Sequence, residues 1–585
     1  MRALRHLNKY FLKYKYRLLI GLVITIIARV FATLVPSFVG KSVDVVQQYL
    51  NNEVSSLDEV KSGLIFNILL IFGSVLISAF FTFLMRQTFI VVSRFIEFDL
   101  KNEVFQHYEK LSLNFYKKNR TGDLMNRISE DVSRVRMYVG PAIMYSVNTL
   151  TLFVVVIGYM ISIAPELTLY TVAPLPILSV SIYKLSVAIH KRSTVVQEFL
   201  SKLTTFTQES FSGITVIKAY GIETQTHDNF TELSNTSRDK NLDLAKVQAL
   251  FFPLMVLLIG FSNILVIYIG GQQYLDGTIK DVGIIVQFIL YVNMLTWPVA
   301  TVGWVSSIIQ QAEASQSRIN EFLSQEPEIT NTVTKNTPIQ GNISFDNVSF
   351  IYDDTNITAL DNVSFEIKNG ETIGVVGKTG SGKSTILDLI GRLYDVSSGE
   401  IRIDGIPIRD LNLTDIRERI GYVPQDAFLF SDSIRNNIKF GKENATDDEV
   451  YQAAKDAVVH KNIIGFKAKY ETVLGERGIT LSGGQKQRVS IARAIIKNPS
   501  ILLFDDCLSA VDTETEEEIL QNINKISKDK TTFIVSHRVS TTKNADKIIV
   551  LENGKIIQQG THNQLLKIDG YYKELYLKQL SEKEI

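Results

Sequence analysis

The stretch Gly374–Leu393, GVVGKTGSGKSTILDLIGRL, decides the fold of the second half of the chain. Its centre, Gly377–Thr385, fits the pattern GxxxxGK[ST]. The residues before it, Thr372–Val376, predict a short buried strand, and apolar residues after Ser384 recur at the spacing of an amphipathic helix. Glycines let backbone N–H groups close around phosphate oxygens, and a helix N-terminus adds the positive end of a dipole. The stretch therefore predicts a phosphate-binding loop.

The side chains of this loop indicate a nucleotide with a metal ion. Lys383 supplies a point charge for the β- and γ-phosphates, and the Ser384 hydroxyl is a ligand for Mg²⁺. The predicted nucleotide-binding residues of the loop are Gly377, Lys378, Thr379, Gly380, Ser381, Gly382, Lys383, Ser384 and Thr385.

Length and composition exclude several classes of protein. A chain of 585 residues is too long for one ordinary domain. Lys and Arg together number 61, as do Asp and Glu, so the overall charge points to no nucleic acid partner. The single cysteine, Cys507, excludes an internal disulfide framework and suits a domain in the reducing cytosol. We expect no secretory signal peptide, because the apolar run from Leu18 is too long and lacks a cleavage site.

The first half, residues 1–320, predicts a bundle of membrane-spanning helices. Six stretches hold roughly 20 or more mainly apolar residues, enough for a hydrocarbon core about 30 Å thick. They lie near Leu18–Val39, Gly63–Met85, Ile143–Ile163, Thr168–Val187, Ala249–Ile269 and Val282–Val302. The stretches Val92–Leu111 and Lys191–Phe206 keep helical periodicity, so the spans are expected to continue as rods beyond the membrane.

Basic residues predict the orientation of the spans. The N-terminal tail is rich in Lys and Arg and should be cytoplasmic, whereas the segment after the first span is acidic and should be external. An even number of spans returns the second half to the cytosol. The chain is thus predicted to be an integral protein of the cell (inner) membrane, with its N-terminus and nucleotide-binding half cytoplasmic.

Two arginines lie in or beside the spans. Arg29 falls close to the middle of the first span, where a charge is costly, so it should face a wet cavity, substrate or a partner group rather than lipid. Arg86, at the inner end of the second span, is expected to extend its charged end to the interface.

The second half, residues 343–577, follows a polar linker at 321–342 and predicts an α/β domain. Tyr352 ends an alternating strand and is placed to stack on a base. Ile420–Val423 predicts another strand, and Ser482 with two glycines opens a helix. The apolar run Ile501–Phe504 predicts a central parallel strand closed by two acids, the first of which, Asp505, is where Mg²⁺ can be held. A last buried strand ends at a histidine.

Taken in order, these motifs resemble the ATP-binding cassette of an ABC transporter, and nearly the whole chain resembles a type I ABC exporter. The phosphate loop resembles Walker A, and residues 501–506 resemble Walker B. Tyr352 matches the aromatic A-loop residue, Gln425 the Q-loop and His537 the switch histidine. The family signature is Leu481, Ser482, Gly483, Gly484 and Gln485, and the D-loop is Ser509, Ala510, Val511 and Asp512. Residues 472–478 resemble the segment that precedes the signature in exporters.

The resemblance implies a fold, a reaction and a partner. The expected fold is a membrane α-helical bundle followed by an α/β P-loop NTPase cassette. The expected reaction is ATP hydrolysis, with Asp506, His537 and Gln425 as catalytic residues and Ser384, Gln425 and Asp505 at the metal ion. In the family each ATP lies between the Walker loops of one cassette and the signature of another. A chain with one copy of each is therefore expected to be a half-transporter that works as a dimer.

Asp506 departs from the family pattern, which has Glu at this position. Asp is one methylene shorter, and a misplacement of ~1 Å can cost ~10²-fold in rate. The chain is therefore expected to be the degenerate-site subunit of a heterodimer, whose intact signature serves the partner's site. A homodimer with weak hydrolysis is the alternative, since His537 is retained.

The expected transported compound is small and amphipathic or lipid-like. A multidrug pump, a lipid flippase and a ligand-gated channel or regulator on the same scaffold all remain open. A soluble cassette ATPase is excluded by the six spans, and fusion of both domains with long intracellular rods favours an exporter over an importer.

Overall fold

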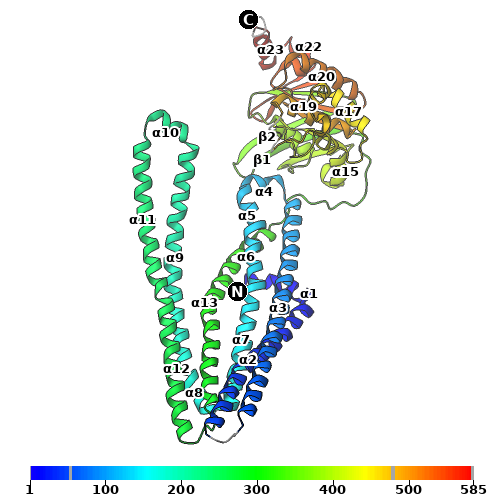
Figure 1. The fold of residues 1–585 in the computed structure, drawn as a ribbon. Helices are drawn as coiled ribbons and strands as arrows, with labels where there is room; N and C mark the ends of the chain where they lie inside the picture. Colours follow the sequence, from blue (N-terminus) through cyan, green and yellow to red (C-terminus); the bar gives the residue numbers. More distant parts are fainter. Residues whose placement is uncertain (1, 52–55, 476–477, 479–480, 582–585) are drawn as a thin grey trace. The chain divides into compact units, whose positions relative to one another are not determined.

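The computed structural model shows an all-helical part and an α/β part (Figure 1). It describes residues 2–51, 56–475, 478 and 481–581. By its internal contacts the chain divides into two compact units, Met1–His107 with Gly122–Ser324, and Tyr108–Thr121 with Gln325–Ile585. The segment 108–121 lies between two membrane helices in the sequence, yet it belongs to the unit that contains the cassette.

Long apolar helices form the first unit. Within the described residues, five continuous helical stretches are long and apolar enough to cross a membrane: Lys15–Leu50, Leu57–Lys110, Thr121–Ile163, Glu223–Leu275 and Gly283–Leu323. They contain the helices α2 (Lys15–Leu50), α3 (Leu57–Lys110), α7 (Ile143–Ile163), α12 (Phe251–Leu275) and α13 (Gly283–Leu323). Five of the six predicted spans overlap these helices, and Ala249–Ile269 and Val282–Val302 begin two residues or fewer before α12 and α13.

The fourth predicted span, residues 168–187, is divided between two helices. They are α8 (Pro165–Val172) and α9 (Pro174–Ser212), with Ala173 between them. Pro174 and Pro176 have no backbone N–H to donate to the preceding turn, which accounts for the break. Sequence hydropathy alone did not predict this interruption.

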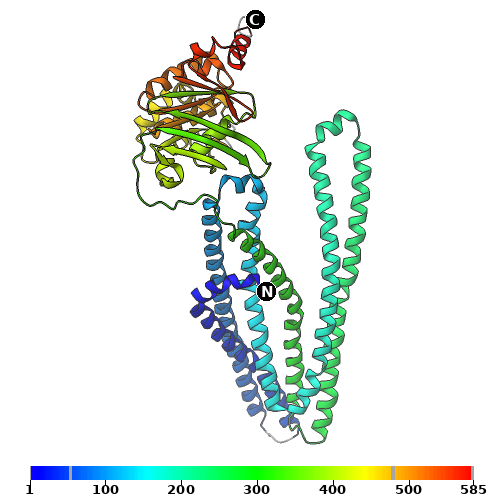
Figure 2. The same cartoon turned by 180° about the vertical axis from the view of Figure 1, so that it is seen from behind.

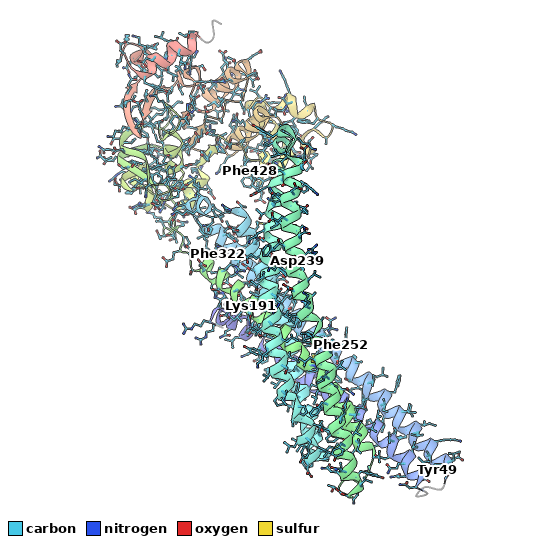
Figure 3. All side chains as sticks on the ribbon, turned by 90° about the vertical axis from the view of Figure 1, so that its left-hand side faces the viewer. Tyr49, Lys191, Asp239, Phe252, Phe322 and Phe428 are labelled. Atoms are coloured by element: carbon cyan, nitrogen blue, oxygen red, sulfur yellow. The ribbon has the colours of Figure 1, made fainter. Side chains whose placement is uncertain are left out.

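Helices α9 and α11 (Glu223–Ala249) run side by side, joined by the short helix α10 (Ile214–Tyr220) (Figures 1 and 2). As predicted, helical structure continues through Val92–Lys110 in α3 and Lys191–Phe206 in α9. No residue of α10 or α11 is buried in this described part of the chain. Lys191 and Asp239, labelled in Figure 3, are among the exposed residues of this helix pair.

Shorter helices complete the first unit. They are η1 (Ala3–Leu7), α1 (Asn8–Lys13), α5 (Thr121–Asn126), α6 (Val132–Met137) and the π-helical turns η2 (Arg127–Asp131) and η3 (Tyr138–Ala142). Arg318 of α13 forms a bidentate ion pair with the buried carboxylate of Asp131. This pair fixes the start of the α6 segment against α13.

Two β-sheets form the centre of the second unit. The antiparallel sheet has the order β2-β1-β4-β5, from β1 (Ile343–Tyr352), β2 (Ile357–Ile367), β4 (Ser398–Ile403) and β5 (Ile406–Pro407). The larger sheet has the order β10-β9-β3-β8-β7-β6, from β3 (Thr372–Gly377), β6 (Ile420–Val423), β7 (Ile501–Asp505), β8 (Thr531–Val535), β9 (Lys547–Glu552) and β10 (Lys555–Gly560). Strands β6, β7, β8, β3 and β9 are parallel to one another.

Helices cover both sheets and join their strands. They are α14 (Lys383–Ile390), η4 (Ile408–Asp410), α15 (Leu413–Glu418), α16 (Ile434–Lys439), α17 (Asp447–Asp456), α18 (His460–Ile464), η5 (Lys469–Glu471), α19 (Gly483–Ile496), α20 (Thr513–Ile526), α21 (Val539–Thr542), α22 (His562–Leu565) and α23 (Tyr571–Ser581). Helix α4 (Leu113–Lys118) packs within the same unit. Every residue of β7 is buried, as expected for a central parallel strand. Because parallel strands end at one edge, the residues that follow β3, β6, β7 and β8 are brought together.

Candidate functional site

The phosphate loop connects β3 to α14 and requires glycine at defined positions. Gly380 and Gly382 have φ of +80° and +97°, a region that other residues rarely adopt. A Cβ on Gly382 would lie 2.2 Å from the carbonyl oxygen of Ala359, and one on Gly377 would lie 2.3 Å from that of Leu551. The Ser381 hydroxyl is buried without a hydrogen-bond partner in the described residues. Tight glycines and an unpartnered hydroxyl both fit an anionic ligand in this loop.

Lys383 lies at the base of the loop, where its side chain is buried. Its Nζ donates to the carbonyl oxygens of Gly377 at 2.9 Å and Lys378 at 2.8 Å. Burial lowers the pKa of Lys383, while the charges of Asp506 and Asp505 oppose that shift. The ammonium is thus held beside the loop interior, at the place where phosphate oxygens would receive its hydrogen bonds.

Ser384 and Asp505 meet as the sequence predicts for a Mg²⁺ site. The Ser384 hydroxyl donates to the carboxylate of Asp505 at 2.9 Å. Burial raises the pKa of Asp505, and the hydrogen bond from Ser384 opposes that shift. One hydroxyl and one carboxylate are suitable oxygen donors for Mg²⁺, which takes its other ligands from phosphates and water. The donor set therefore fits the ion.

Gln425 forms no hydrogen bond with the other predicted Mg²⁺-site residues among the described residues. Its side chain is exposed and has no hydrogen bond to Ser384 or Asp505 in the described residues. Its carbonyl oxygen accepts a hydrogen bond from Nε2 of Gln487, a residue of α19, at 3.1 Å. This contact ties the segment after β6 to the helix that begins at the signature.

Asp506 follows β7, and His537 follows β8. Both residues interact electrostatically with Lys383. Asp506 is 9 % exposed and has φ of +41°. Its N–H donates to the carbonyl oxygen of Val535 at 2.9 Å, which anchors it to the end of β8. Burial lowers the pKa of His537, Lys383 lowers it further, and both carboxylates oppose this. The neutral imidazole is favoured, in which one ring nitrogen can accept a proton.

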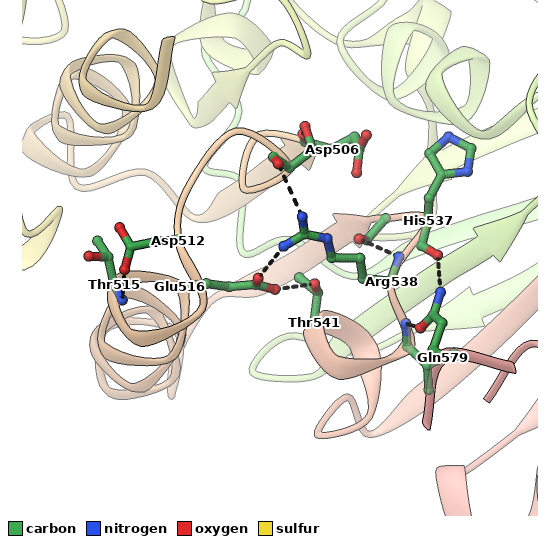
Figure 4. Close-up of polar contacts among 11 residues, drawn as sticks. Asp506, Asp512, Thr515, Glu516, His537, Arg538, Thr541 and Gln579 are labelled. Carbon is green, nitrogen blue, oxygen red and sulfur yellow. Dashed lines mark hydrogen bonds and ion pairs between the residues drawn. The ribbon is translucent and has the colours of Figure 1, made fainter. Parts of the chain in front are cut away.

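Arg538 is a supporting residue that motif reading did not identify. Its guanidinium donates to the buried carboxylate of Glu516 at 2.8 Å and to the Ser509 carbonyl oxygen at 3.2 Å (Figure 4). Gln579 donates to the His537 carbonyl oxygen at 2.9 Å. These contacts hold the segment after β8 against α20 and the D-loop. In the sequence, the only indication of this role was that Arg538 directly follows His537.

The signature forms a capped helix start. The Ser482 hydroxyl accepts from the Gln485 N–H at 3.3 Å, and the Gln485 side chain accepts from the Ser482 N–H at 3.0 Å. A Cβ on Gly484 would lie 2.7 Å from the Ala510 carbonyl oxygen, so the signature packs against the D-loop. In the described residues no hydrogen bond joins 481–485 to 377–385. Of residues 472–478, Glu476 and Arg477 lie outside the described residues.

Tyr352 lies in an aromatic cluster beside the loop. Its hydroxyl is 3.0 Å from the Thr385 hydroxyl, and its ring packs edge to face with Phe350 and Tyr394. The ammonium of Lys117, from α4, lies 4.6 Å from the centre of the Tyr352 ring and 5.0 Å from that of Tyr394. Such contacts are attractive cation–π interactions. The predicted base-stacking residue is therefore in direct contact with α4.

Two further contacts fix α4 on the cassette. Glu328, in the segment between α13 and β1, accepts hydrogen bonds from the Ser112 hydroxyl at 2.7 Å and the Asn114 amide at 2.9 Å. Both donors are buried. Helix α4 therefore contacts the cassette through these bonds as well as through Lys117.

Replacement of Tyr352 with Ala should raise KM for ATP by roughly 5- to 100-fold, because stacking of a base on an aromatic ring contributes about 1–3 kcal/mol. Tyr352→Phe keeps the ring and loses one hydrogen bond, so we expect a change of about fivefold or less. Steady-state ATP hydrolysis by the full chain measures both values. Equal KM values for the two variants would show that the ring does not contact the base.

Asp388, one turn along α14 from Thr385, should make stability depend on pH. Burial raises its pKa to about 6, although Lys117 opposes the shift. Because the folded pKa exceeds the ordinary value of 3.8, the folded state binds more protons between these values, and stability falls as pH rises through that window. Asp388→Asn should therefore stabilise the cassette above about pH 6, by about 1–3 kcal/mol. Thermal midpoints of both proteins at acidic and neutral pH measure this, and a difference that does not grow with pH would contradict it.

Comparison with known proteins identifies the class that this site defines. The family model for the ABC transporter transmembrane region matches residues 18–299, and the ABC transporter model matches residues 360–509. The chain belongs to the ABC transporter family. It is an integral membrane protein and an ATPase that couples ATP hydrolysis to transport.

Individual relatives cover most or nearly all of the chain. The probable multidrug resistance ABC transporter ATP-binding/permease protein YheI of Bacillus subtilis (strain 168) is 37 % identical over 99 % of this chain and 97 % of its own length. The ATP-dependent lipid A-core flippase of Syntrophus aciditrophicus (strain SB) is 35 % identical over 83 % of this chain and 81 % of its own. A bacterial Atm1-family ABC exporter with ATP bound has a TM-score of 0.79 at 28 % identity, covering 97 % of this chain and 98 % of that one.

Proposed function

We propose that the chain is one half of a dimeric exporter that uses ATP to move an amphipathic or lipid-like substrate across the inner membrane by alternating access. One observation carries the dimer: the chain has a single phosphate loop and a single signature, and no hydrogen bond connects them in the described residues. A second chain must then supply the signature that completes each ATP site. In this proposal the N-terminus and the cassette are cytoplasmic.

The exposed helix α10 supports pairing with a second chain. Ile214, Val216 and Tyr220 of α10 are all exposed, although they are apolar or aromatic. A short apolar helix at the end of a helix pair gains stability when a partner surface covers it. We infer that α10 docks on a cassette in the dimer and transmits the state of the ATP site to the spans.

The residues of the ATP site have the following proposed roles. The loop 377–385 binds the phosphates, with Lys383 as the cation, and Tyr352 stacks on the base. Ser384 and Asp505 hold Mg²⁺, which neutralises phosphate charge when bound, and Gln425 approaches the ion when the cassettes close. Asp506 orients the attacking water and receives its proton, and His537, held by the Arg538 segment, contacts the γ-phosphate. Residues 481–485 and 509–512 face the partner's nucleotide.

Asp506 favours a heterodimer in which this chain supplies the slow site. The side chain of Asp506 is one methylene shorter than that of the Glu found in the family. The hydrogen bond from the Asp506 N–H to the Val535 carbonyl oxygen holds the backbone of Asp506 in place, so the backbone does not shift to make up the difference. A homodimeric lipid flippase is the second candidate, favoured by similarity to a relative named as a lipid A-core flippase. Purification of the chain alone, followed by ATPase measurement, separates these two assemblies.

Reconstitution in lipid vesicles tests the export function. Lipids, peptides and amphipathic drugs are compared for stimulation of ATP hydrolysis and for movement across the bilayer. We expect at least one amphipathic class to stimulate hydrolysis and to be moved only with ATP. Hydrolysis without movement of any compound would instead favour a regulator or channel on this scaffold.

A further inference from the structure

Arg29 has no role in the ATP site, yet it lies in α2 near the middle of the first predicted span. A charged side chain at this depth is energetically costly unless water or a polar group compensates it. Intramembrane charges are therefore retained mainly where they pair with another group or serve a transport path. The residues around Arg29 indicate which group compensates its charge.

The membrane-spanning sequence supplies no counter-charge for Arg29. The six predicted spans contain no Asp and no Glu. Their charged residues are Arg29 and Lys184, and Lys184 lies close to the end of the fourth span that is predicted to be cytoplasmic. A second copy of this chain would add cations to these spans and no anions. The sequence of the spans therefore places an uncompensated positive charge, that of Arg29, near the middle of the membrane.

The contacts of Arg29 leave much of its hydrogen-bonding capacity unused. One of its terminal nitrogens donates to the Thr82 hydroxyl of α3 at 3.2 Å. Its Nε is buried and has no hydrogen-bond partner among the described residues. A guanidinium has five N–H donors arranged to bind two oxygens of a carboxylate or phosphate at once. A neutral hydroxyl cannot neutralise it.

The surroundings of Arg29 suit an amphipathic ligand. Helices α2 and α3 meet at this level, where the Ser78 hydroxyl donates to the Ala28 carbonyl oxygen at 3.0 Å. Ile26 and Val30 beside Arg29, and Phe83 beside Thr82, are exposed apolar side chains. A cation and a hydroxyl thus lie between apolar surfaces.

We propose that Arg29 binds the anionic head group, a phosphate, sulfate or carboxylate, of the transported amphiphile when that group is midway across the membrane. The proposal rests on the export function above and adds the charge of the substrate. A charged head group faces its highest barrier in the hydrocarbon centre, and a fixed cation there lowers that barrier. The occupant is the transported molecule and not an anionic lipid of the surrounding bilayer.

The test uses the full-length chain, in its native assembly, in phosphatidylcholine vesicles. Dodecyl phosphate, dodecylphosphocholine and dodecyltrimethylammonium share one tail and differ in charge, and each is titrated below its micelle concentration. Stimulated ATP hydrolysis gives a half-maximal concentration for each. We expect dodecyl phosphate to act at a concentration at least about tenfold lower than the others, as expected for charge-assisted hydrogen bonds.

The variant Arg29→Gln should remove this preference. We expect a rise of about tenfold or more in the half-maximal concentration of dodecyl phosphate, with the response to the other two compounds within about twofold. Arg29→Lys, which keeps the charge, should lie between, and Arg86→Gln should behave as wild type. If Arg29→Gln does not assemble, the preference of the wild type for dodecyl phosphate and the response of Arg29→Lys test the proposal.

Other outcomes separate the two proposals. Equal responses of the wild type to all three compounds would overturn the role of Arg29 and leave export intact. No response to any compound, and no transport, would overturn export itself. Stimulation by phosphatidylglycerol that is not moved between the two leaflets, lost in Arg29→Gln and with no added effect of dodecyl phosphate, would assign Arg29 to bilayer lipid and overturn the proposal.

Discussion

Lys383→Ala, in the chain purified without a partner, is expected to lower ATP hydrolysis and ATP-driven transport by at least about a hundredfold, equal to about 2.7 kcal/mol of transition-state stabilisation. The Lys383 ammonium is buried and already points at the loop, where it donates to two loop carbonyl oxygens. It therefore needs little reorganisation to meet the negative charge that develops on the phosphates during transfer. Alanine leaves the same space without a positive charge.

A neighbouring lysine in the same loop offers a matched comparison. Lys378 is exposed and its ammonium pairs with Glu552 at 2.9 Å, outside the loop interior. We expect Lys378→Ala to cause a much smaller loss, because its backbone and not its ammonium serves the loop. Hydrolysis in detergent and efflux from loaded proteoliposomes measure both variants. Full-speed, ATP-dependent efflux by the Lys383→Ala chain without a partner would remove the coupling of ATP to transport on which the proposed function depends.

Asp506→Glu is expected to raise ATP hydrolysis at this chain's own phosphate loop, by up to about a hundredfold. The added methylene extends the carboxylate toward the γ-phosphate, where a water-orienting group must lie within hydrogen-bond distance. One cost opposes the gain. Asp tolerates the positive φ at this position better than Glu does, so we expect a loss of stability of about 1 kcal/mol, visible in the thermal midpoint.

Further variants give the Asp506 experiment its controls. Asp506→Asn keeps the shape and removes the basic carboxylate, so it should lower the wild-type rate further. His537→Ala placed on Asp506→Glu should abolish the gain if both residues act on one phosphate. Brisk hydrolysis by the unmodified chain, with no gain from Glu, would contradict a degenerate site and favour the homodimer.

Residues close together in the sequence allowed the arrangement of most of the candidate ATP site to be predicted. Strand β3, the glycine loop and α14 form one continuous pattern of local backbone preference, and the structure confirms that arrangement. The buried run at β7 predicted a central strand, which the structure also confirms. Because acids and polar residues end such strands, the meeting of Ser384 with Asp505 followed from the rule that parallel strands end at one edge.

Contacts between distant residues were not predictable in the same way. Lys117 meets Tyr352, although α4 precedes β1 by more than two hundred residues and carries no pattern that indicates an aromatic partner. Glu516 and Arg538 form an ion pair between α20 and the segment after β8, two elements with no shared local signal. The break at Ala173 also escaped prediction, because the hydropathy of residues 168–187 is continuous although two prolines interrupt the hydrogen bonding.

The sequence by itself determined that this protein spans a membrane and contains a cassette that binds ATP, because apolar length, strand and helix periodicity and glycine spacing are local properties of a chain. The tertiary structure alone decided that α4 packs on Tyr352, that Arg538 holds the segment of His537, and that Arg29 contacts the Thr82 hydroxyl. Those pairings depend on how helices and sheets pack, and packing is set by the sum of many weak contacts across the fold rather than by any single stretch.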